Sequence, residues 1–165
     1  MTGRSLRATI NQTEVGTLQE VNGLWSFQYA ANWVDDPQGF ALSPHLPLTA
    51  EPLLDGASRR PVQWYFDNLL PEEGQRALLA GDAKLDVADA FGLLAWYGAE
   101  SAGSLTLLPP KAVPQTDEPL RPLPDDLLEA RIRQLPKAPL THAAIKRMSL
   151  AGAQHKLAVV LKDDA

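Results

Sequence analysis

The chain has 165 residues, 45% of them hydrophobic, which is enough apolar material for one sizeable domain or for a small domain and part of another. Its formal net charge of −5, from 20 acidic and 15 basic residues, argues against direct DNA binding, because nucleic-acid-binding surfaces are normally basic. The absence of cysteine excludes disulfides and cysteine-ligated zinc and agrees with a reducing cytoplasm. The sequence shows no signal peptide and no bilayer-length apolar run, so we expect a cytoplasmic protein without a membrane partner. The three histidines, His45, His142 and His155, lack metal-ligand spacing, and structural or solvated roles are favoured for them.

Alternating apolar and polar residues predict strands in the first part of the chain. Leu6–Ile10 and Val15–Leu18 alternate on either side of the turn-forming residues 11–13. Leu24–Tyr29 alternates again, and it follows Asn22-Gly23, which is a strong hairpin signal. These segments together predict a small antiparallel sheet.

The interval from Ala31 to Leu54 is rich in prolines and turn-forming residues, and it predicts no long element. We expect an irregular connection along a sheet edge, with one short strand near Phe40–Ser43. A binding loop is the alternative interpretation of this interval.

A helical period begins at Pro61, where one face carries Val62, Tyr65, Phe66 and Leu69. Pro61 suits the first turn of a helix, and Pro71 ends the segment. A second helix is predicted to begin at Pro71, with two glutamates at its positive end, and to stop at Gly81.

The third predicted helix has the clearest signals. Asp86 can cap the backbone donors of Val87–Tyr97, and Gly98 closes the helix. Apolar residues occur on both sides of this helix, so we expect burial on more than one face, and core packing explains its aromatic residues better than a cofactor site does. Residues 104–108 then predict a strand that returns to the opening sheet.

Residues 109–124 contain six prolines, and we interpret this stretch as a linker between a first subdomain, residues 1–108, and a second, residues 125–165. A short helix is predicted after the linker, opened by Asp125 and Asp126 and stopped at Pro136. The whole pattern predicts an α+β fold in which a small antiparallel sheet packs with helices.

The stretch from Met148 to Leu161 predicts an anion-binding turn. The small residues Ala151–Ala153 leave the backbone open to a ligand, and Lys156 adds a positive charge before an apolar run that predicts a buried strand. Backbone N–H groups and an ammonium group can together share the negative charge of nucleotide phosphates. Neither a P-loop nor a protein-kinase glycine loop fits, because Gly152 is the only glycine of the stretch. On this pattern alone, a tight turn between two strands is the competing interpretation.

Several motifs follow one another as in a known family, from about residue 4 to residue 161. The most specific are Phe66-Asp67-Asn68-Leu69-Leu70-Pro71 and the segment Ser149–Lys156, which reads Ser-Leu-Ala-Gly-Ala-Gln-His-Lys. Others accompany them: Val15–Leu18, Asn22-Gly23, Phe27 with Tyr29, Leu42–Leu48, Phe91–Leu94 with Gly98, and Ala102–Leu107. Together they resemble the HipA family of bacterial serine/threonine kinase toxins.

The resemblance implies a two-lobed kinase-like enzyme, with this chain holding an N-terminal subdomain and the beginning of a kinase-like N-lobe. In that family the Ala-Gly-Ala-Gln-x-Lys loop covers the ATP phosphates, which assigns nucleotide contact to Ala151, Gly152, Ala153, Gln154, His155 and Lys156. Ser149 matches the family's autophosphorylation site, whose modification expels the loop and silences the kinase. A turn or strand-end hydroxyl is the alternative for Ser149. His155 stands where many members carry an acidic residue, which leaves its contribution to ATP binding open.

The resemblance also implies what the activity needs besides this loop. Phosphoryl transfer requires a further lysine, a catalytic aspartate with its asparagine, and a Mg²⁺-binding aspartate. All of these would lie beyond Ala165, so we expect a fragment of a longer kinase or a split-system subunit, inactive alone. The implied partners are the missing C-terminal half, a helix-turn-helix (HipB-like) antitoxin that makes any DNA contact, and a protein substrate such as an aminoacyl-tRNA synthetase.

Two other functions stay open. The chain is alternatively a non-catalytic, antitoxin-like module that regulates a separate kinase. Related small proteins of split systems end near the position of the proline-rich linker, so the presence of residues 125–161 weighs against this alternative. An unrelated nucleotide-binding α+β domain is the third, less favoured function.

Overall fold

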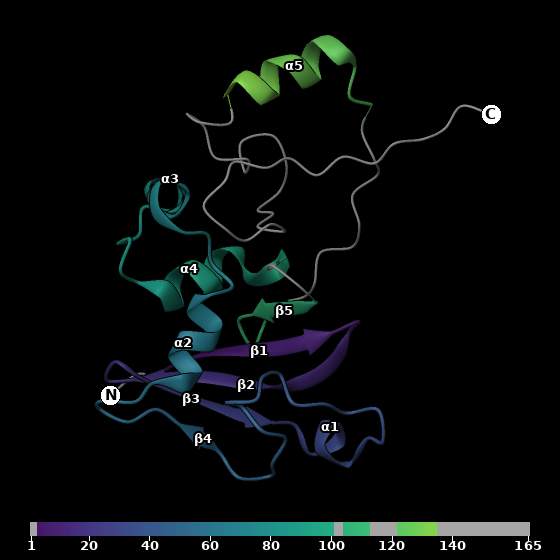
Figure 1. Cartoon of the computed structure of the whole chain (residues 1–165), viewed down its shortest axis with the longest axis vertical. Coiled ribbons are helices and arrows are strands. Elements are labelled where there is room, and N and C mark those ends of the chain that lie inside the picture. Colours follow the sequence, from purple (N-terminus) through teal and green to yellow (C-terminus); the bar gives the residue numbers. More distant parts are fainter. Residues whose placement is uncertain (1–2, 101–103, 113–121, 135–165) are drawn as a thin grey trace, which may run out of the picture.

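The computed structural model describes residues 3–100, 104–112 and 122–134, and it contains a five-stranded antiparallel sheet (Figure 1). In chain order the strands are β1 (Arg4–Ile10), β2 (Thr13–Val21), β3 (Leu24–Tyr29), β4 (Leu53–Leu54) and β5 (Leu105–Leu108). They lie in the order β4-β3-β2-β1-β5, and each neighbouring pair is antiparallel. Helices pack against this sheet, so the predicted α+β class is confirmed.

Two tight hairpins form the centre of the sheet. Asn11-Gln12 makes the turn between β1 and β2, and Asn22-Gly23 makes the turn between β2 and β3. All four turn residues have positive φ, as a type I′ turn requires, and the twist of that turn matches the twist of the strands it joins. Both predicted hairpins are confirmed.

The connection between β3 and β4 begins with a helix that the sequence pattern did not predict, α1 (Ala31–Asp35). Its Trp33 is buried, and the indole Nε1 donates a hydrogen bond to the carbonyl oxygen of Phe40 at 3.0 Å. The two rings also meet edge to face, with 5.2 Å between their centroids. The connection therefore folds back on itself around one tryptophan.

The strand predicted near Phe40–Ser43 is wrong. Ser43 forms only an isolated bridge with Leu46, and the paired strand of this region is β4. The reason is the hydroxyl of Tyr29, which accepts a hydrogen bond from the N–H of Leu42 at 2.9 Å and donates one to the carbonyl oxygen of Leu46 at 2.7 Å. Because a side chain binds these backbone groups, the segment wraps around Tyr29 and does not extend the sheet.

The remaining helices are α2 (Pro61–Asp67), α3 (Glu73–Ala83), α4 (Ala90–Tyr97) with a 3₁₀ turn at Gly98–Glu100, and α5 (Asp125–Gln134). In Figure 1, α2, α3 and α4 lie on the same side of the sheet. Each predicted helix is present, and α2 begins at its proline as expected. The differences concern where α3 and α4 begin and end.

The predicted limits of α3 are corrected at both ends. The helix begins at Glu73, after Pro71, and Gly81 does not stop it. The chain leaves the helix at Lys84, which adopts the left-handed conformation with φ 55° and donates its N–H to the carbonyls of Ala80 and Gly81. A helix ends where a residue adopts the left-handed conformation, and here that residue is Lys84. Gly81 keeps the helical conformation, so its presence in the last turn does not end the helix.

The predicted cap of α4 is also wrong. Asp89, not Asp86, precedes the helix, and its carboxylate accepts the N–H of Gly92 at 3.0 Å. Asp86 instead accepts the N–H of Ala88 at 2.8 Å in the preceding turn. The two aspartates are three positions apart, so local pattern alone could not choose between them.

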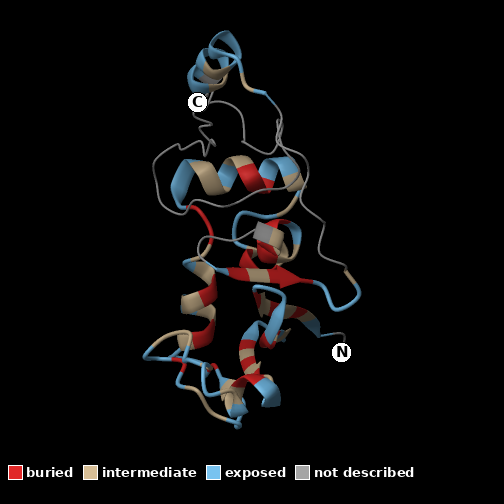
Figure 2. Ribbon diagram, turned by 90° about the vertical axis from the view of Figure 1, so that its right-hand side faces the viewer, coloured by how far each residue is buried: buried red, intermediate tan, exposed pale blue. Residues whose placement is uncertain are grey.

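The core lies between the sheet and the helices α2 and α4, where the buried residues (red) gather in Figure 2. Trp25 of β3 meets Phe91 of α4 edge to face, with 5.1 Å between the ring centroids. Phe27 of β3 meets Phe66 of α2 at 5.3 Å. The residues that α4 buries are Ala90, Phe91, Leu93, Leu94 and Tyr97, so burial on more than one face is confirmed, although Trp96 and Val87 are exposed.

β5 closes the sheet beside β1, with Leu107 opposite Ala8, and this confirms the predicted return of residues 104–108. The end of α4 approaches this strand closely, since a Cβ built on Gly98 would lie 2.7 Å from the Cβ of Leu107. A glycine at this position therefore permits the contact between α4 and β5.

Beyond β5, the structure describes α5, on which Leu127 and Ile132 are exposed. The predicted linker and second subdomain stay predictions, because residues 113–121 and 135–165 lie outside the described residues. Among the described helices, none has both the length and the apolar character that a membrane span needs.

Candidate functional site

The residues assigned to nucleotide binding lie outside the described residues. They are Ala151, Gly152, Ala153, Gln154, His155 and Lys156, and Ser149 lies outside as well. Their roles, and the strand expected after them, stay predictions. Within the described ranges, no three histidine or carboxylate side chains are grouped as metal ligands would be. Two other features have a defined geometry, the Phe66–Pro71 motif and a surface hollow at the start of α2.

The Phe66–Pro71 motif forms the end of α2 and the bend toward α3. Phe66 and Leu70 are buried in the core, with exposed fractions of 0% and 2%. The N–H of Leu69 binds the carbonyl oxygen of Phe66 at 3.1 Å, and the N–H of Leu70 binds that of Asp67 at 3.0 Å. The motif therefore sets the direction of the chain between two helices, which is a structural role.

Asp67 of the same motif extends this role through an ion pair. Its Oδ1 lies 2.8 Å from Nη1 of Arg76 on α3. The Arg76 Nε also donates a hydrogen bond to the carbonyl oxygen of Val87 at 2.9 Å, in the segment that precedes α4. One arginine thus connects α2, α3 and the approach to α4.

A second arginine connects the edge of the sheet to α4. Arg4 of β1 donates to Oε2 of Glu20 on β2 at 2.8 Å, and to both carboxylate oxygens of Asp89 at 2.7 and 2.9 Å. Its guanidinium lies over the ring of Phe91, 4.9 Å from the centroid, a cation–π geometry. The hydrogen bond from Arg4 holds the pKa of Glu20 below its ordinary value. This cluster fixes the start of α4 on the sheet.

At the other end of α4, Tyr97 attaches this helix to α3. Its side chain is fully buried, and its hydroxyl lies 2.8 Å from Oδ2 of Asp82 and 3.0 Å from the carbonyl oxygen of Leu79. Burial, and then the hydrogen bond to Asp82, raise the pKa of the Tyr97 phenol well above its ordinary value. The group stays neutral at physiological pH, so it holds α3 against α4 and does not act as a base.

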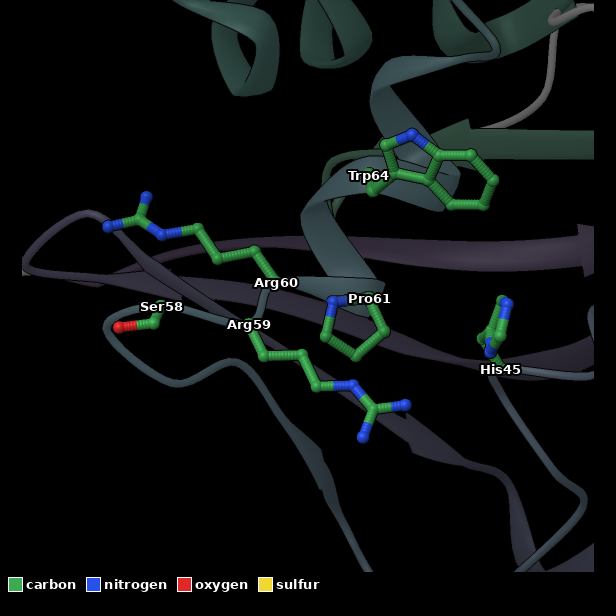
Figure 3. Close-up of a pocket in the computed structure, with 6 residues that line it drawn as sticks. All are labelled: His45, Ser58, Arg59, Arg60, Pro61 and Trp64. Atoms are coloured by element: carbon green, nitrogen blue, oxygen red, sulfur yellow. The ribbon is translucent and has the colours of Figure 1, made fainter.

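A shallow surface hollow of about 420 Å³ lies at the start of α2 (Figure 3). Its lining residues are His45, Ser58, Arg59, Arg60, Pro61 and Trp64. Figure 3 shows the Arg59 side chain extending beneath Pro61 to the side on which His45 lies, while Arg60 extends the opposite way. The His45 and Trp64 rings are nearly perpendicular, at 73°, with 6.3 Å between their centroids.

Asp55 holds the backbone beneath this hollow. It is the one buried charged residue of the described core, with 7% exposed. Its two carboxylate oxygens accept the N–H groups of Val62 and Gln63 at 2.8 and 2.9 Å, so it caps α2 from outside the helix. Its own N–H donates to the carbonyl oxygen of Trp25 on β3 at 2.9 Å. The loop is thereby tied to both the helix and the sheet.

Arg60 adds a second anchor to the same loop. Its Nη1 donates to the carbonyl oxygen of Gly23 at 3.2 Å and to Oε1 of Gln63 at 2.9 Å. The N–H of Gly56 binds the carbonyl oxygen of Arg59 at 2.8 Å within the loop. The described hollow therefore rests on a loop whose backbone position is fixed.

A family model described as the HipA N-terminal domain matches residues 6–108 of this chain. The chain belongs to the HipA N-terminal domain family. The matched region runs from β1 to β5, and it includes the Phe66–Pro71 motif and the whole hollow. The resemblance drawn from the sequence motifs is confirmed for this region.

Two relatives extend the comparison. A Sinorhizobium fredii protein named “Putative kinase Y4mE” is 38% identical over an alignment of 151 residues, and the match covers 88% of this chain and 35% of that protein. A chain in the solved complex of the Shewanella oneidensis MR-1 toxin–antitoxin system HipA, HipB and its operator DNA matches 82% of this chain and 30% of its own length. That match has a TM-score of 0.64 at 24% identity, and it shows a shared fold. This HipA-like chain thus spans about a third of the length of each relative.

Sequence reasoning missed the residues that position this region. Asp55 acts on amides seven and eight residues later, and Arg4 acts on a carboxylate 85 residues away. No fixed local spacing marks either contact. The one available signal was the Pro61 start of α2, which predicts that an acceptor must cover the first amides but does not say which residue supplies it.

Proposed function

We propose that this chain is the N-terminal part of a HipA-like serine/threonine kinase toxin of a toxin–antitoxin system, and that it is catalytically incomplete alone. The observation that carries the proposal is the HipA N-terminal domain over residues 6–108, followed by the Ser149–Lys156 motif. The 38% identity to a protein named as a kinase supports the same activity. Because the chain covers only 35% of that protein, the catalytic groups are expected on other residues.

ATP is the proposed nucleotide. Main-chain N–H groups around Gly152 and the ammonium of Lys156 are suited to phosphate, because several donors share the charge where no side chain blocks access. Ala151, Ala153, Gln154 and His155 complete the proposed contact segment. Mg²⁺ neutralises phosphate charge in this class of reaction, and its ligands are proposed to lie beyond Ala165.

Ser149 is the proposed control point. A phosphate on its hydroxyl would add nearly two negative charges beside a loop that has to receive the phosphates of ATP. Repulsion between the two would disfavour the nucleotide-bound loop. Lys146 and Arg147 are close in sequence and can pair with the new phosphate in an alternative arrangement.

The proposed partners follow from the relatives. The Shewanella HipA occurs with HipB and operator DNA, so a HipB-like helix-turn-helix antitoxin is proposed here, with DNA contact through that antitoxin. The C-terminal half of a kinase is the second partner, and a protein substrate, for example an aminoacyl-tRNA synthetase, is the third. A cytoplasmic location is proposed with them.

A second candidate function is a non-catalytic module that regulates a separate kinase. The observation in its favour is that the described core is closed by β5 at Leu108, where the family match also ends. Such a unit can fold and bind without the Ser149–Lys156 loop. It would inhibit a HipA-like kinase and would not complete one.

The experiment that separates the two functions uses this chain with the part of the 38%-identical relative that this chain does not match. ATP binding and transfer of labelled phosphate are measured for each polypeptide alone and for the mixture. Activity that occurs only in the mixture supports the kinase-part proposal. Inhibition of the intact relative by this chain, without recovered activity in the mixture, supports the regulatory module.

The nucleotide loop needs its own test. Replacing Gly152→Leu puts a side chain where the ATP phosphates are proposed to lie, and the affinity of the reconstituted kinase for ATP should fall about tenfold or more. Gly81→Leu is the matched control, since nothing lies within 4 Å of a Cβ built at Gly81. Equal ATP affinity for the two variants would contradict the assigned loop.

A further inference from the structure

Trp64 is placed on the outer side of α2 by the period of the helix. Val62 and Phe66, two residues before and two after it, are fully buried. At about 100° per residue, a side chain two positions away points to the opposite side of a helix. Trp64 is accordingly 60% exposed, whereas Trp25 and Trp33 are buried at 4% and 6%.

Single exposed apolar side chains are common on protein surfaces, but Trp64 is part of a larger arrangement. It forms the hollow described above together with Pro61 and the ring of His45, whose centroid lies 6.3 Å from that of Trp64. These groups give the hollow an apolar wall. The Asp55 cap and the Arg60 anchor hold the loop beneath it, so little ordering is needed when a ligand enters.

The charge of the hollow is opposite to that of the whole chain. The chain carries a formal net charge of −5, yet among the six described residues that line the hollow two are arginines, one is histidine and none is acidic. Arg59 is exposed, and no described residue forms a hydrogen bond or ion pair with its guanidinium. An available arginine beside an exposed tryptophan is the composition typical of interface hot spots.

We propose that this hollow docks an acidic segment of a partner protein, with a large apolar side chain against Trp64 and a carboxylate on Arg59. Guanidinium groups bind carboxylates through two parallel hydrogen bonds, which fixes the orientation of the segment as well as its affinity. Arg60 keeps its contacts with Gly23 and Gln63 and adds positive potential at the rim. The surface lies inside residues 6–108, and the proposal does not depend on kinase activity.

The same charges favour an acidic peptide over nucleic acid. A duplex presents a phosphate charge about every 1.7 Å along its axis, and binding it takes a long basic face. Two arginines on a chain of net charge −5 do not supply such a face. A peptide can place a few carboxylates at the rim and keep the rest of its surface away from the acidic chain.

The test is a selection of random 12-residue peptides, displayed on phage, against the full chain. We expect the enriched peptides to combine aspartate or glutamate with a large apolar residue. A synthetic copy of an enriched peptide, measured by fluorescence anisotropy, should bind the Arg59→Glu and Trp64→Ala variants about tenfold or more weakly. Arg59→Lys keeps the charge without the bidentate geometry and should give an intermediate loss.

Matched controls come from the same chain. Trp96→Ala removes another exposed tryptophan, 43% exposed on α4, and Lys111→Glu reverses another exposed positive charge. Both should bind the peptide as the unchanged chain does, and circular dichroism should show that every variant is folded. The proposal is overturned if no peptide is enriched, if the enriched peptides lack acidic residues, or if the two hollow variants bind as tightly as the controls. It is also overturned if a 20-base-pair duplex binds with the same sensitivity to Arg59→Glu and Trp64→Ala.

Discussion

The helices α2 and α4 both pack on the same face of the sheet. At the start of each helix, an aspartate accepts hydrogen bonds from backbone N–H groups of the first turn. The two aspartates differ in their position in the chain and in their exposure to solvent. Asp55 comes from the loop after β4, is 7% exposed, and accepts two N–H groups. Asp89 directly precedes α4, its side chain is 29% exposed, and it accepts one N–H and binds Arg4. One helix is capped from a distance in the core, and the other is capped locally near the surface.

This difference determines how far water can replace each cap. If the Asp89 carboxylate is removed, solvent can reach the amide that it leaves behind, and only a typical cap energy is lost. Of the two amides that Asp55 accepts, that of Gln63 is partly buried, but that of Val62 lies in the core, so the Val62 amide would stay unpaired. Leaving a buried donor unpaired costs more than the average hydrogen bond contributes. We therefore expect the start of α2 to be the more sensitive position.

The largest expected effect is that of Asp55→Ala. It removes both acceptors of α2, and the free energy of unfolding should fall by about 3 kcal/mol. Urea denaturation followed by far-UV circular dichroism measures the loss. Asp55→Asn keeps one carbonyl acceptor, so its free energy of unfolding should lie between those of the unchanged chain and of Asp55→Ala. If Asp55→Ala costs no more than Asp89→Ala, burial does not distinguish the two caps.

The second prediction concerns the other end of α4, which packing holds against β5. Gly98→Ala places a Cβ 2.7 Å from the Cβ of Leu107 and 2.9 Å from its carbonyl oxygen, and backbone there cannot move away easily. Overpacking of this kind should lower the free energy of unfolding by about 2 kcal/mol. Gly81→Ala is the control, because the space around Gly81 is open and alanine favours helix; it should be neutral or slightly stabilising. Similar denaturation midpoints for both variants would contradict the close approach.

The elements that the sequence predicted correctly are those specified by neighbouring residues. Asn22-Gly23 identified its hairpin because the turn itself demands positive φ, and Pro61 identified the start of α2 because proline suits that position. The cap of α4 was missed because Asp86 and Asp89 both fit a local pattern. Arg4, which binds Asp89, is distant in sequence, so the choice depended on the tertiary fold.

The candidate site shows the same limit. The strand expected near Phe40–Ser43 was overridden by one hydroxyl, that of Tyr29, and nothing in the segment itself announces that contact. The hollow at Trp64 was not predicted either, because its lining joins residues 58–64 to His45, which is distant in sequence and meets them only in the folded chain. The nucleotide loop is the opposite case, since Gly152 and Lys156 belong to one continuous motif. Those residues lie outside the described ranges, so that assignment remains a prediction.

The third prediction measures the local cap directly. Asp89→Ala removes the acceptor of the Gly92 N–H and one partner of Arg4, and the free energy of unfolding should fall by about 1 kcal/mol. The same denaturation experiment as for Asp55→Ala applies. Asp86→Ala is the neighbouring control, since Asp86 accepts a hydrogen bond only in the turn before the helix, and it should cost less. The reverse order would assign the cap to Asp86 after all.

The smallest expected effect is a dependence on pH at Glu20, the other partner of Arg4. Because the hydrogen bond from Arg4 lowers the pKa of Glu20 in the folded chain below the value of 4.5 expected for a free glutamate, the folded state binds this proton less readily than the unfolded state does. The contribution of the Arg4–Glu20 pair to the free energy of unfolding is therefore complete above pH 4.5, and it is lost as the pH falls through the pKa of Glu20 in the folded chain. Its size should be about 0.5 kcal/mol, since the Arg4 side chain is 45% exposed and solvent screens the pair. Urea denaturation of the unchanged chain and of Glu20→Gln between pH 7 and pH 3 measures this contribution together with that of the Gly23 N–H, which the Glu20 carboxylate also accepts at 2.7 Å, and the two curves should converge only on the acid side. If the difference in free energy of unfolding between the two proteins is the same at every pH, the charge of Glu20 does not stabilise the fold. Asp89 would then be the one carboxylate whose pairing with Arg4 holds α4 on the sheet.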